Sequence, residues 1–174
     1  MALVFIVETG AGLVDATAYC DVAWGDDFHA SHLYASVWTD MTTSEKQSAL
    51  VWATRLLDEQ VEWAGWKTTQ EQALRWPRSG APDRESSASL SMAYYDYGVT
   101  LASNIIPVWL KNATAELART LKASDRTADL STVGYSEITV DKLNVLPDSV
   151  LAMVLPYGRV QRSGGITFAR LVRA

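Results

Sequence analysis

Cysteine and histidine are scarce in this sequence, and long apolar runs are missing. The single cysteine, Cys20, allows no disulfide within the chain, so we expect a reducing compartment. No stretch reaches the roughly 18 apolar residues that a membrane-spanning helix needs. Residues 2–7 are apolar, but they lack a basic lead and run directly into Glu8, which is not the pattern of a signal peptide. The sequence therefore predicts a protein without membrane contact.

The motifs of common enzyme classes are missing as well. The sequence has no phosphate-binding loop of the Walker type, no zinc or EF-hand spacing and no serine-nucleophile motif. His29 and His32 lie beside Asp26 and Asp27, and the spacing of the two histidines can place them on one helix face. A zinc site needs further ligands that the sequence does not offer, so we interpret this group as an exposed polar face. We expect no catalysis, no metal and no cofactor.

The amino-terminal residues predict an extended segment and a turn. Residues 3–8 are typical of a short strand or an extended arm, and Gly10 and Gly12 follow them. A dinucleotide-binding turn would need a third glycine where Asp15 stands, and no alternation of strands and helices follows. We therefore interpret the two glycines as a flexible turn.

A first helix is predicted to begin at Asp15 or Asp21 and to end near His32, because either aspartate can be its N-cap. Gly25 lies inside this stretch and lowers its helix propensity. The side chains expected on its buried face are Tyr19, Trp24 and Phe28.

Overall composition indicates one domain with a packed core. Of the 174 residues, 48% are hydrophobic and 20% are charged, which is typical of a globular protein. The 15 basic and 20 acidic residues give a formal charge of −5. An acidic chain is poorly suited to general binding of nucleic acid, because that binding needs lysine and arginine to neutralise phosphates.

Residues 42–65 predict one long central helix. Thr42 with Glu45 can form a capping box at its start, and Ser44 with Gln47 is the alternative. Gly65 can provide a left-handed stop. Apolar residues cover so much of the predicted helix that we expect neighbours on two sides. They are Leu50, Ala53, Leu57 and Val61, with Trp52, Leu56 and Trp63 one step round.

The next region predicts loops and a projecting hairpin. Residues 67–78 can form one or two helical turns that end at Pro77, with Trp76 in the core. Residues 79–91 have loop composition, and residues 92–101 are typical of a hairpin. Its tyrosines are candidates for contact with a partner, and cross-strand packing is an equal alternative. They are Tyr94, Tyr95 and Tyr97.

Two more helices are predicted in the second half of the chain. Pro107 stands in the first turn of a helix over residues 107–123, where a missing N–H costs least. Residues 124–131 have linker composition, residues 133–140 are typical of a strand, and residues 147–156 predict a short last helix.

From residue 158 onward the composition changes. Residues 158–174 contain four arginines and no acidic residue, and they also contain large apolar residues that a disordered tail normally lacks. A frayed terminus is the ordinary alternative. We favour a segment that docks on another chain by strand addition or helix packing. Its candidate contact residues are Arg159, Arg162, Ile166, Phe168, Arg170, Leu171 and Arg173.

Together these elements predict a mainly α fold. We expect a small helical bundle with a β-hairpin or short-strand insertion and an extended C-terminal tail. The helical domain would comprise residues 1–157, with its projection at about 79–104, and the docking tail would comprise residues 158–174.

Several stretches together resemble a known family of bacteriophage proteins. They are Val7-Glu8-Thr9-Gly10-Ala11-Gly12-Leu13, Ser44-Glu45-Lys46 with Ala49-Leu50, Gln72-Ala73-Leu74-x-Trp76-Pro77-Arg78-x-Gly80, and Ile106-Pro107 with Glu116-Leu117-Ala118. The Leu-x-Trp-Pro-Arg-x-Gly element is the most specific of them. Over most of residues 7–123 the chain is similar to phage proteins labelled DnaT-like single-stranded DNA-binding, which resemble the head–tail connector (adaptor) proteins of tailed phages.

This resemblance implies a helical adaptor in the neck of the virion, made in the host cytoplasm. About twelve copies would form a ring below the portal protein, and a tail or stopper protein would attach beneath it. Double-stranded DNA would pass through the lumen without tight binding. Each subunit of a ring needs two different patches, and the tail and the tyrosine-bearing projection are our candidates.

Two alternatives stay open. The family label describes a binder of single-stranded DNA, here in phage replication, which would stack bases on tryptophan and tyrosine in a basic groove. However, Trp52, Trp63 and Trp76 fall where a core needs them, and basic residues form no stripe with aromatics outside the tail. The other alternative is a tail-completion or stopper protein, one layer lower in the neck.

Overall fold

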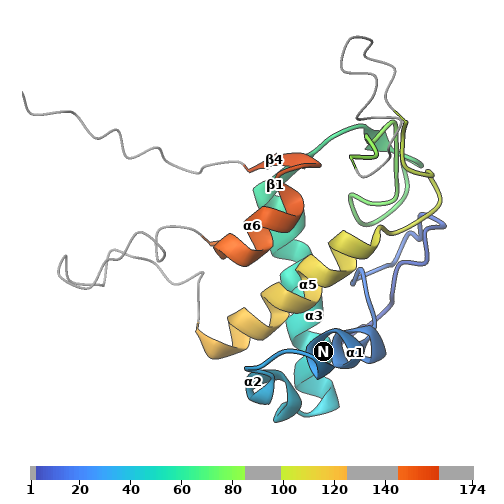
Figure 1. The fold of residues 1–174 in the computed structure, drawn as a ribbon. Coiled ribbons are helices and arrows are strands. Elements are labelled where there is room, and N and C mark those ends of the chain that lie inside the picture. Colours follow the sequence, from blue (N-terminus) through green and yellow to red (C-terminus); the bar gives the residue numbers. More distant parts are fainter. Residues whose placement is uncertain (1–2, 85–98, 125–144, 161–174) are drawn as a thin grey trace, which may run out of the picture.

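The computed structural model describes residues 3–84, 99–124 and 145–160 (Figure 1). Helices dominate these ranges, and two short antiparallel ribbons join them. The fold is therefore mixed and helix-rich, without the regular packing of a bundle. The helices are α1 (Val22–Ala30), α2 (Ser36–Thr39), α3 (Thr43–Gln60), α5 (Val108–Ala123) and α6 (Asp148–Val154). The ribbons pair β1 (Val61–Trp63) with β4 (Gly158–Val160) and β2 (Trp66–Lys67) with β3 (Arg78–Ser79).

Residues 92–98 of the predicted hairpin, the predicted strand at 133–140 and the tail beyond residue 160 lie outside the described residues. The last residues of that hairpin are described, and Thr100 forms an isolated β-bridge with Pro82 rather than part of a regular strand. Within the described ranges, no helix is both long and apolar enough to cross a membrane.

The start of α3 confirms the predicted capping box. The Glu45 N–H donates to the Thr42 hydroxyl at 3.3 Å, and the Thr42 N–H donates to the Glu45 carboxylate at 2.9 Å. These bonds satisfy N–H groups that have no partner inside the helix.

The predicted end of this helix was wrong, because α3 ends at Gln60 and the chain continues as β1. Val61 pairs with Val160 of β4, a partner that local propensity does not reveal. Gly65 is left-handed as predicted, with a φ of 75°, but it lies in the turn between β1 and β2. A Cβ atom at Gly65 would lie 2.3 Å from the Ser79 carbonyl oxygen, so the turn requires glycine.

Helix α5 is the most enclosed element of the described fold. It packs against α3 and α6 and also contacts α1 and α2 (Figure 1). Its residues 113–118 are all buried, and the alanines among them allow close approach of the neighbouring helices. Pro107 is the N-cap of α5 and so lies just outside the helix rather than in its first turn.

The three tryptophans that we predicted to lie in the core differ in their exposure to solvent. Trp63 and Trp76 are buried, which confirms their prediction. Trp52 is 42% exposed, so its prediction was wrong. The reason is its position on α3, one turn from the exposed residues Ser48 and Arg55 on the polar side of the helix.

Helix α1 begins after Asp21, whose side chain accepts a hydrogen bond from the Trp24 N–H. Asp21 rather than Asp15 is therefore the N-cap. Tyr19 is buried as expected, but it precedes the helix. Gly25 has a packing role, because a Cβ atom there would lie 2.5 Å from the Trp38 ring.

Two further local predictions differ from the structure. Residues 3–8 form no regular strand, and only Val7 makes a β-bridge, with Ala18. Residues 67–78 form no helical turn. The Gln72 side chain donates to the carbonyls of Leu74 and Pro77 and accepts from the Thr69 N–H, so it satisfies backbone groups that a helix would otherwise pair.

Candidate functional site

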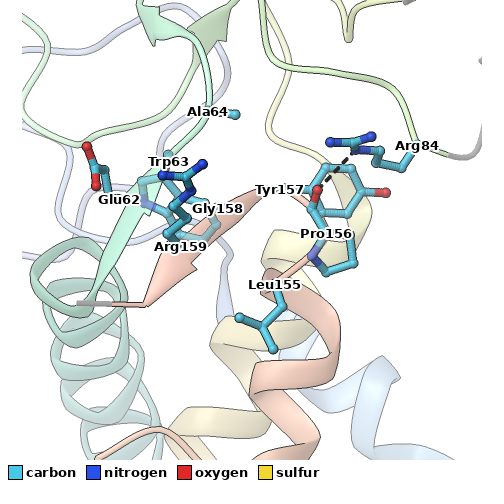
Figure 2. Close-up of a pocket in the computed structure, with 9 residues that line it drawn as sticks. All are labelled: Glu62, Trp63, Ala64, Arg84, Leu155, Pro156, Tyr157, Gly158 and Arg159. Carbon is cyan, nitrogen blue, oxygen red and sulfur yellow. Dashed lines mark hydrogen bonds between the residues drawn. The ribbon is translucent and has the colours of Figure 1, made fainter. Parts of the chain in front are cut away.

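A hollow of about 400 Å³ lies beside the β1–β4 ribbon, where the end of α6 meets the segment before residue 85 (Figure 2). The antiparallel register places Glu62 opposite Arg159 and Trp63 opposite Gly158. A Cβ atom at Gly158 would lie 2.6 Å from the Val61 side chain, so glycine lets the strands approach. The hollow is lined by Glu62, Trp63, Ala64, Arg84, Leu155, Pro156, Tyr157, Gly158 and Arg159.

Two exposed arginines stand on opposite sides of this hollow (Figure 2). The Arg84 Nε donates to the Pro156 carbonyl at 3.3 Å, which holds its guanidinium at the rim. Arg159 lies on β4, opposite Glu62 on β1. With one carboxylate and two guanidinium groups in its lining, the hollow carries a net charge of about +1.

An aromatic cluster lies next to the hollow, and two of its rings, Trp63 and Tyr157, also line it. The Trp109 and Tyr157 rings stack at 4.1 Å between centroids, and the Trp63 and Trp76 rings lie 5.4–5.6 Å from Trp109. Trp63, Trp76 and Tyr157 are buried, so they pack on one another. They therefore offer no open ring face on which a nucleotide base could stack.

The Leu-x-Trp-Pro-Arg-x-Gly element ties the loop before β3 to this cluster. The Arg78 guanidinium donates to the carbonyls of Ala64 at 2.8 Å and Trp63 at 3.3 Å, and also to that of Gly65. The Trp76–Pro77 peptide bond is cis, and the Trp66 ring lies against Gly80. This motif is therefore structural, because its arginine binds the protein's own backbone.

A buried polar group fixes the same loop on α3. The Tyr19 hydroxyl donates to the Asp58 carboxylate and accepts from the Trp76 N–H at 3.2 Å. The Arg75 N–H donates to Asp58 at 3.0 Å. Burial raises the pKa of Asp58, although these hydrogen bonds oppose the increase.

The amino-terminal glycines also bind a buried carboxylate of the protein itself. The buried Glu8 carboxylate accepts hydrogen bonds of 2.8–3.0 Å from the N–H groups of Gly10, Gly12 and Leu13. Both glycines have positive φ. The predicted turn is present, and an internal carboxylate occupies the place that a phosphate takes in nucleotide-binding loops.

The predicted polar group around the histidines is divided between core and surface. His29 is buried, which corrects the interpretation of an exposed face, and its Nε2 donates to the Ala115 carbonyl at 3.1 Å. Burial lowers the pKa of His29. Asp26 is half exposed and pairs with Lys46 at 2.7 Å. Among the described residues, no group of His, Cys, Asp and Glu could hold a metal ion.

Most basic side chains of the described ranges are engaged within the protein. Lys122 pairs with Glu45, and Arg119 pairs with the buried Glu116. The Lys111 ammonium lies 4.6 Å from the centre of the Trp24 ring. Backbone carbonyls accept hydrogen bonds from Lys67, Arg75 and Arg78. In the part of the chain described here, basic residues therefore form no groove with open aromatic rings.

The structure places only part of the predicted interface. Arg159 lies on β4 and lines the hollow, whereas the other six tail candidates and the three tyrosines lie outside the described residues. Sequence reasoning missed Arg84 and Tyr157. No local signal marks them, because the bond between Arg84 and Pro156 joins residues 72 positions apart.

Comparison with known protein families gives a match that covers residues 1–146. The matched family is described as putative DnaT-like ssDNA binding protein. Nothing matches among curated proteins, and nothing matches among solved structures. The resemblance to head–tail connectors receives no support from these comparisons. The match spans well over half of the chain, so this protein belongs to the family of putative DnaT-like single-stranded DNA-binding proteins.

Proposed function

We propose that this protein is a structural head–tail adaptor of a tailed bacteriophage, which binds other protein chains and performs no catalysis. The observation that carries the proposal is that most basic side chains of the described residues bind groups of the protein itself. Arg119 and Lys122 pair with carboxylates, and Arg78 binds backbone carbonyls. Tight binding of DNA needs free cations along a path of phosphates, whereas a passive duct does not.

Exposed apolar side chains support contact with protein. Leu33 is 93% exposed and Tyr34 is 72% exposed, and both lie in the link between α1 and α2. Val108 at the start of α5 and Leu155 after α6 are exposed as well. Apolar groups at a surface contribute to binding when a partner covers them.

In this proposal the subunits form a ring in the virion neck, between the portal protein and a tail or stopper protein. Double-stranded DNA passes through the lumen, and the acidic chain, with its formal charge of −5, does not retain it. The protein is made in the host cytoplasm and then becomes part of the particle.

The family description favours a second candidate, a protein that binds single-stranded DNA, and on the comparisons alone this candidate stands first. Trp66 is 66% exposed, so part of its ring is open to a nucleotide base. Arg84 and Arg159 lie in the same half of the molecule and would contact phosphates.

Two measurements separate these candidates. Electron microscopy of the phage particle with the chain located by a tag should place it at the neck, and its absence from the particle would contradict the adaptor. Binding of a labelled single-stranded oligonucleotide should be weak at moderate salt. Strong binding that falls steeply between 50 and about 200 mM salt would support the second candidate.

A further inference from the structure

Helix α3 lies between two ends of the described fold (Figure 1). Its 18 residues span about 27 Å. Helices α1 and α2 lie at its start, and the β1–β4 ribbon follows its end. The hollow with Arg84 and Arg159 is therefore far from the α1–α2 end.

The α1–α2 end presents unpaired carboxylates. Asp27 on α1 and Asp40 after α2 are exposed, and neither forms an ion pair with the described residues. The nearby Asp26 and Glu45 are paired with Lys46 and Lys122, so they do not add to this unpaired charge.

The hollow at the other end carries positive charge, which is complementary to these carboxylates. Arg84 and Arg159 are exposed, and neither forms an ion pair among the described residues. Glu62 lines the same hollow, so one carboxylate limits the local positive charge. A site of this kind suits a few carboxylates better than a chain of phosphates. Leu155, Pro156 and the buried Tyr157 provide apolar walls.

We propose that the hollow of one subunit binds the acidic α1–α2 end of a second copy of this chain, through Arg84 and Arg159 on one side and Asp27 and Asp40 on the other. Arginine and carboxylate form paired, directional hydrogen bonds. Two different patches at opposite ends give a head-to-tail contact, which closes into a ring when the rotation between subunits allows it. This inference rests on the proposed adaptor function and identifies the surfaces between its subunits.

Other occupants fit the hollow less well. Residues 161–174 of the same chain carry three arginines and no acidic residue, so Arg84 and Arg159 would repel them. A single DNA strand would find no open ring face in the lining of the hollow, because Trp63 and Tyr157 are buried in the aromatic cluster.

Charge reversal in the full chain tests this pairing. One variant carries Arg84→Glu and Arg159→Glu, and the other carries Asp27→Lys and Asp40→Lys. Sedimentation velocity at low salt would measure the assembly of each variant alone and of a 1:1 mixture. Each variant alone should assemble about tenfold more weakly or worse, because like charges meet at every contact. The mixture should recover assembly, because both contacts of an alternating ring are then complementary.

Controls make the result specific. Arg55→Glu and Glu59→Lys change exposed charges on α3 outside both patches and should leave assembly unchanged. Circular dichroism of each variant would check that it is folded. Wild-type assembly that persists in both variants, or a mixture of folded variants that stays dissociated, would overturn the inference and leave the adaptor intact. A wild-type chain that stays monomeric at every concentration would overturn both.

Binding of a labelled single-stranded oligonucleotide is measured with the same proteins. The proposal expects no difference between wild type and the arginine variant. Binding that the arginine pair alone abolishes would make the hollow a DNA site and overturn the inference.

Discussion

At the scale of single residues, Trp52 and Trp76 show how surroundings decide the effect of the same side chain. Trp76 is fully buried in the aromatic cluster, whereas Trp52 is 42% exposed on α3. Trp76→Ala should lower the free energy of unfolding by roughly 3–5 kcal/mol, because it leaves a cavity in the core. Trp52→Ala is the control and should cost about 1 kcal/mol or less. Chemical denaturation measures both values, and equal losses would contradict the assignment of Trp76 to the core.

A second residue-scale prediction concerns pH. Burial lowers the pKa of His29 below its ordinary value of 6.5, and its ring packs against Trp38. The unfolded chain then binds more protons than the folded chain, so the free energy of unfolding should decrease as the pH falls below about 6.5. His29→Gln should reduce this dependence between pH 8 and 5.5, measured by denaturation against wild type. His32→Gln, at a partly exposed position three residues on, is the control. A His29→Gln profile parallel to wild type would refute the assignment.

Residue types and spacing predicted much of the local structure. The Asp21 cap, the Thr42–Glu45 capping box and the short helix that follows Pro147 all depend on neighbours within a few residues. Such signals can be interpreted without knowing the fold, because every group involved lies in the same short stretch.

At the scale of elements, the capping box gives a prediction with an adjacent control. Thr42→Ala should lower the free energy of unfolding by about 1 kcal/mol, because the Glu45 N–H loses its acceptor. Thr43→Ala changes an exposed residue inside the first turn and should have little effect. Thermal unfolding of the two variants would show the difference, and identical curves would mean that the cap contributes nothing.

The ribbon marks the limit of sequence interpretation. Residues 61–63 continue the helical pattern of apolar residues, yet they form β1, because β4 lies alongside them. The hollow depends on the same long-range pairing, together with the bond from Arg84 to Pro156. Neither could be predicted from local pattern, since the partners lie far apart in the chain.

Two truncations measure the contribution of β4. Deletion of 161–174 keeps β4, whereas deletion of 158–174 removes it and uncovers Val61 and Trp63. The longer deletion should therefore be less stable than the shorter one by at least about 1 kcal/mol. Denaturation of the two truncated proteins gives this difference directly. Equal stability would show that residues 158–160 do not belong to the folded body.

At the scale of the whole molecule, the distribution of charge connects structure and function. The chain is acidic overall, with a formal charge of −5, and Arg78, Arg119 and Lys122 are held by internal partners. The exposed Arg84 and Arg159 are separated by the length of α3 from the exposed Asp27 and Asp40. This polarity suits a subunit that contacts its own copies end to end.

The most direct test of this account is sedimentation velocity of the full chain mixed with a fluorescent oligo-thymidine at moderate salt, with both species recorded in one run. We predict that the protein sediments as a closed oligomer while the oligonucleotide stays at the boundary of the free strand. A monomeric protein that carries the oligonucleotide with it would contradict the account.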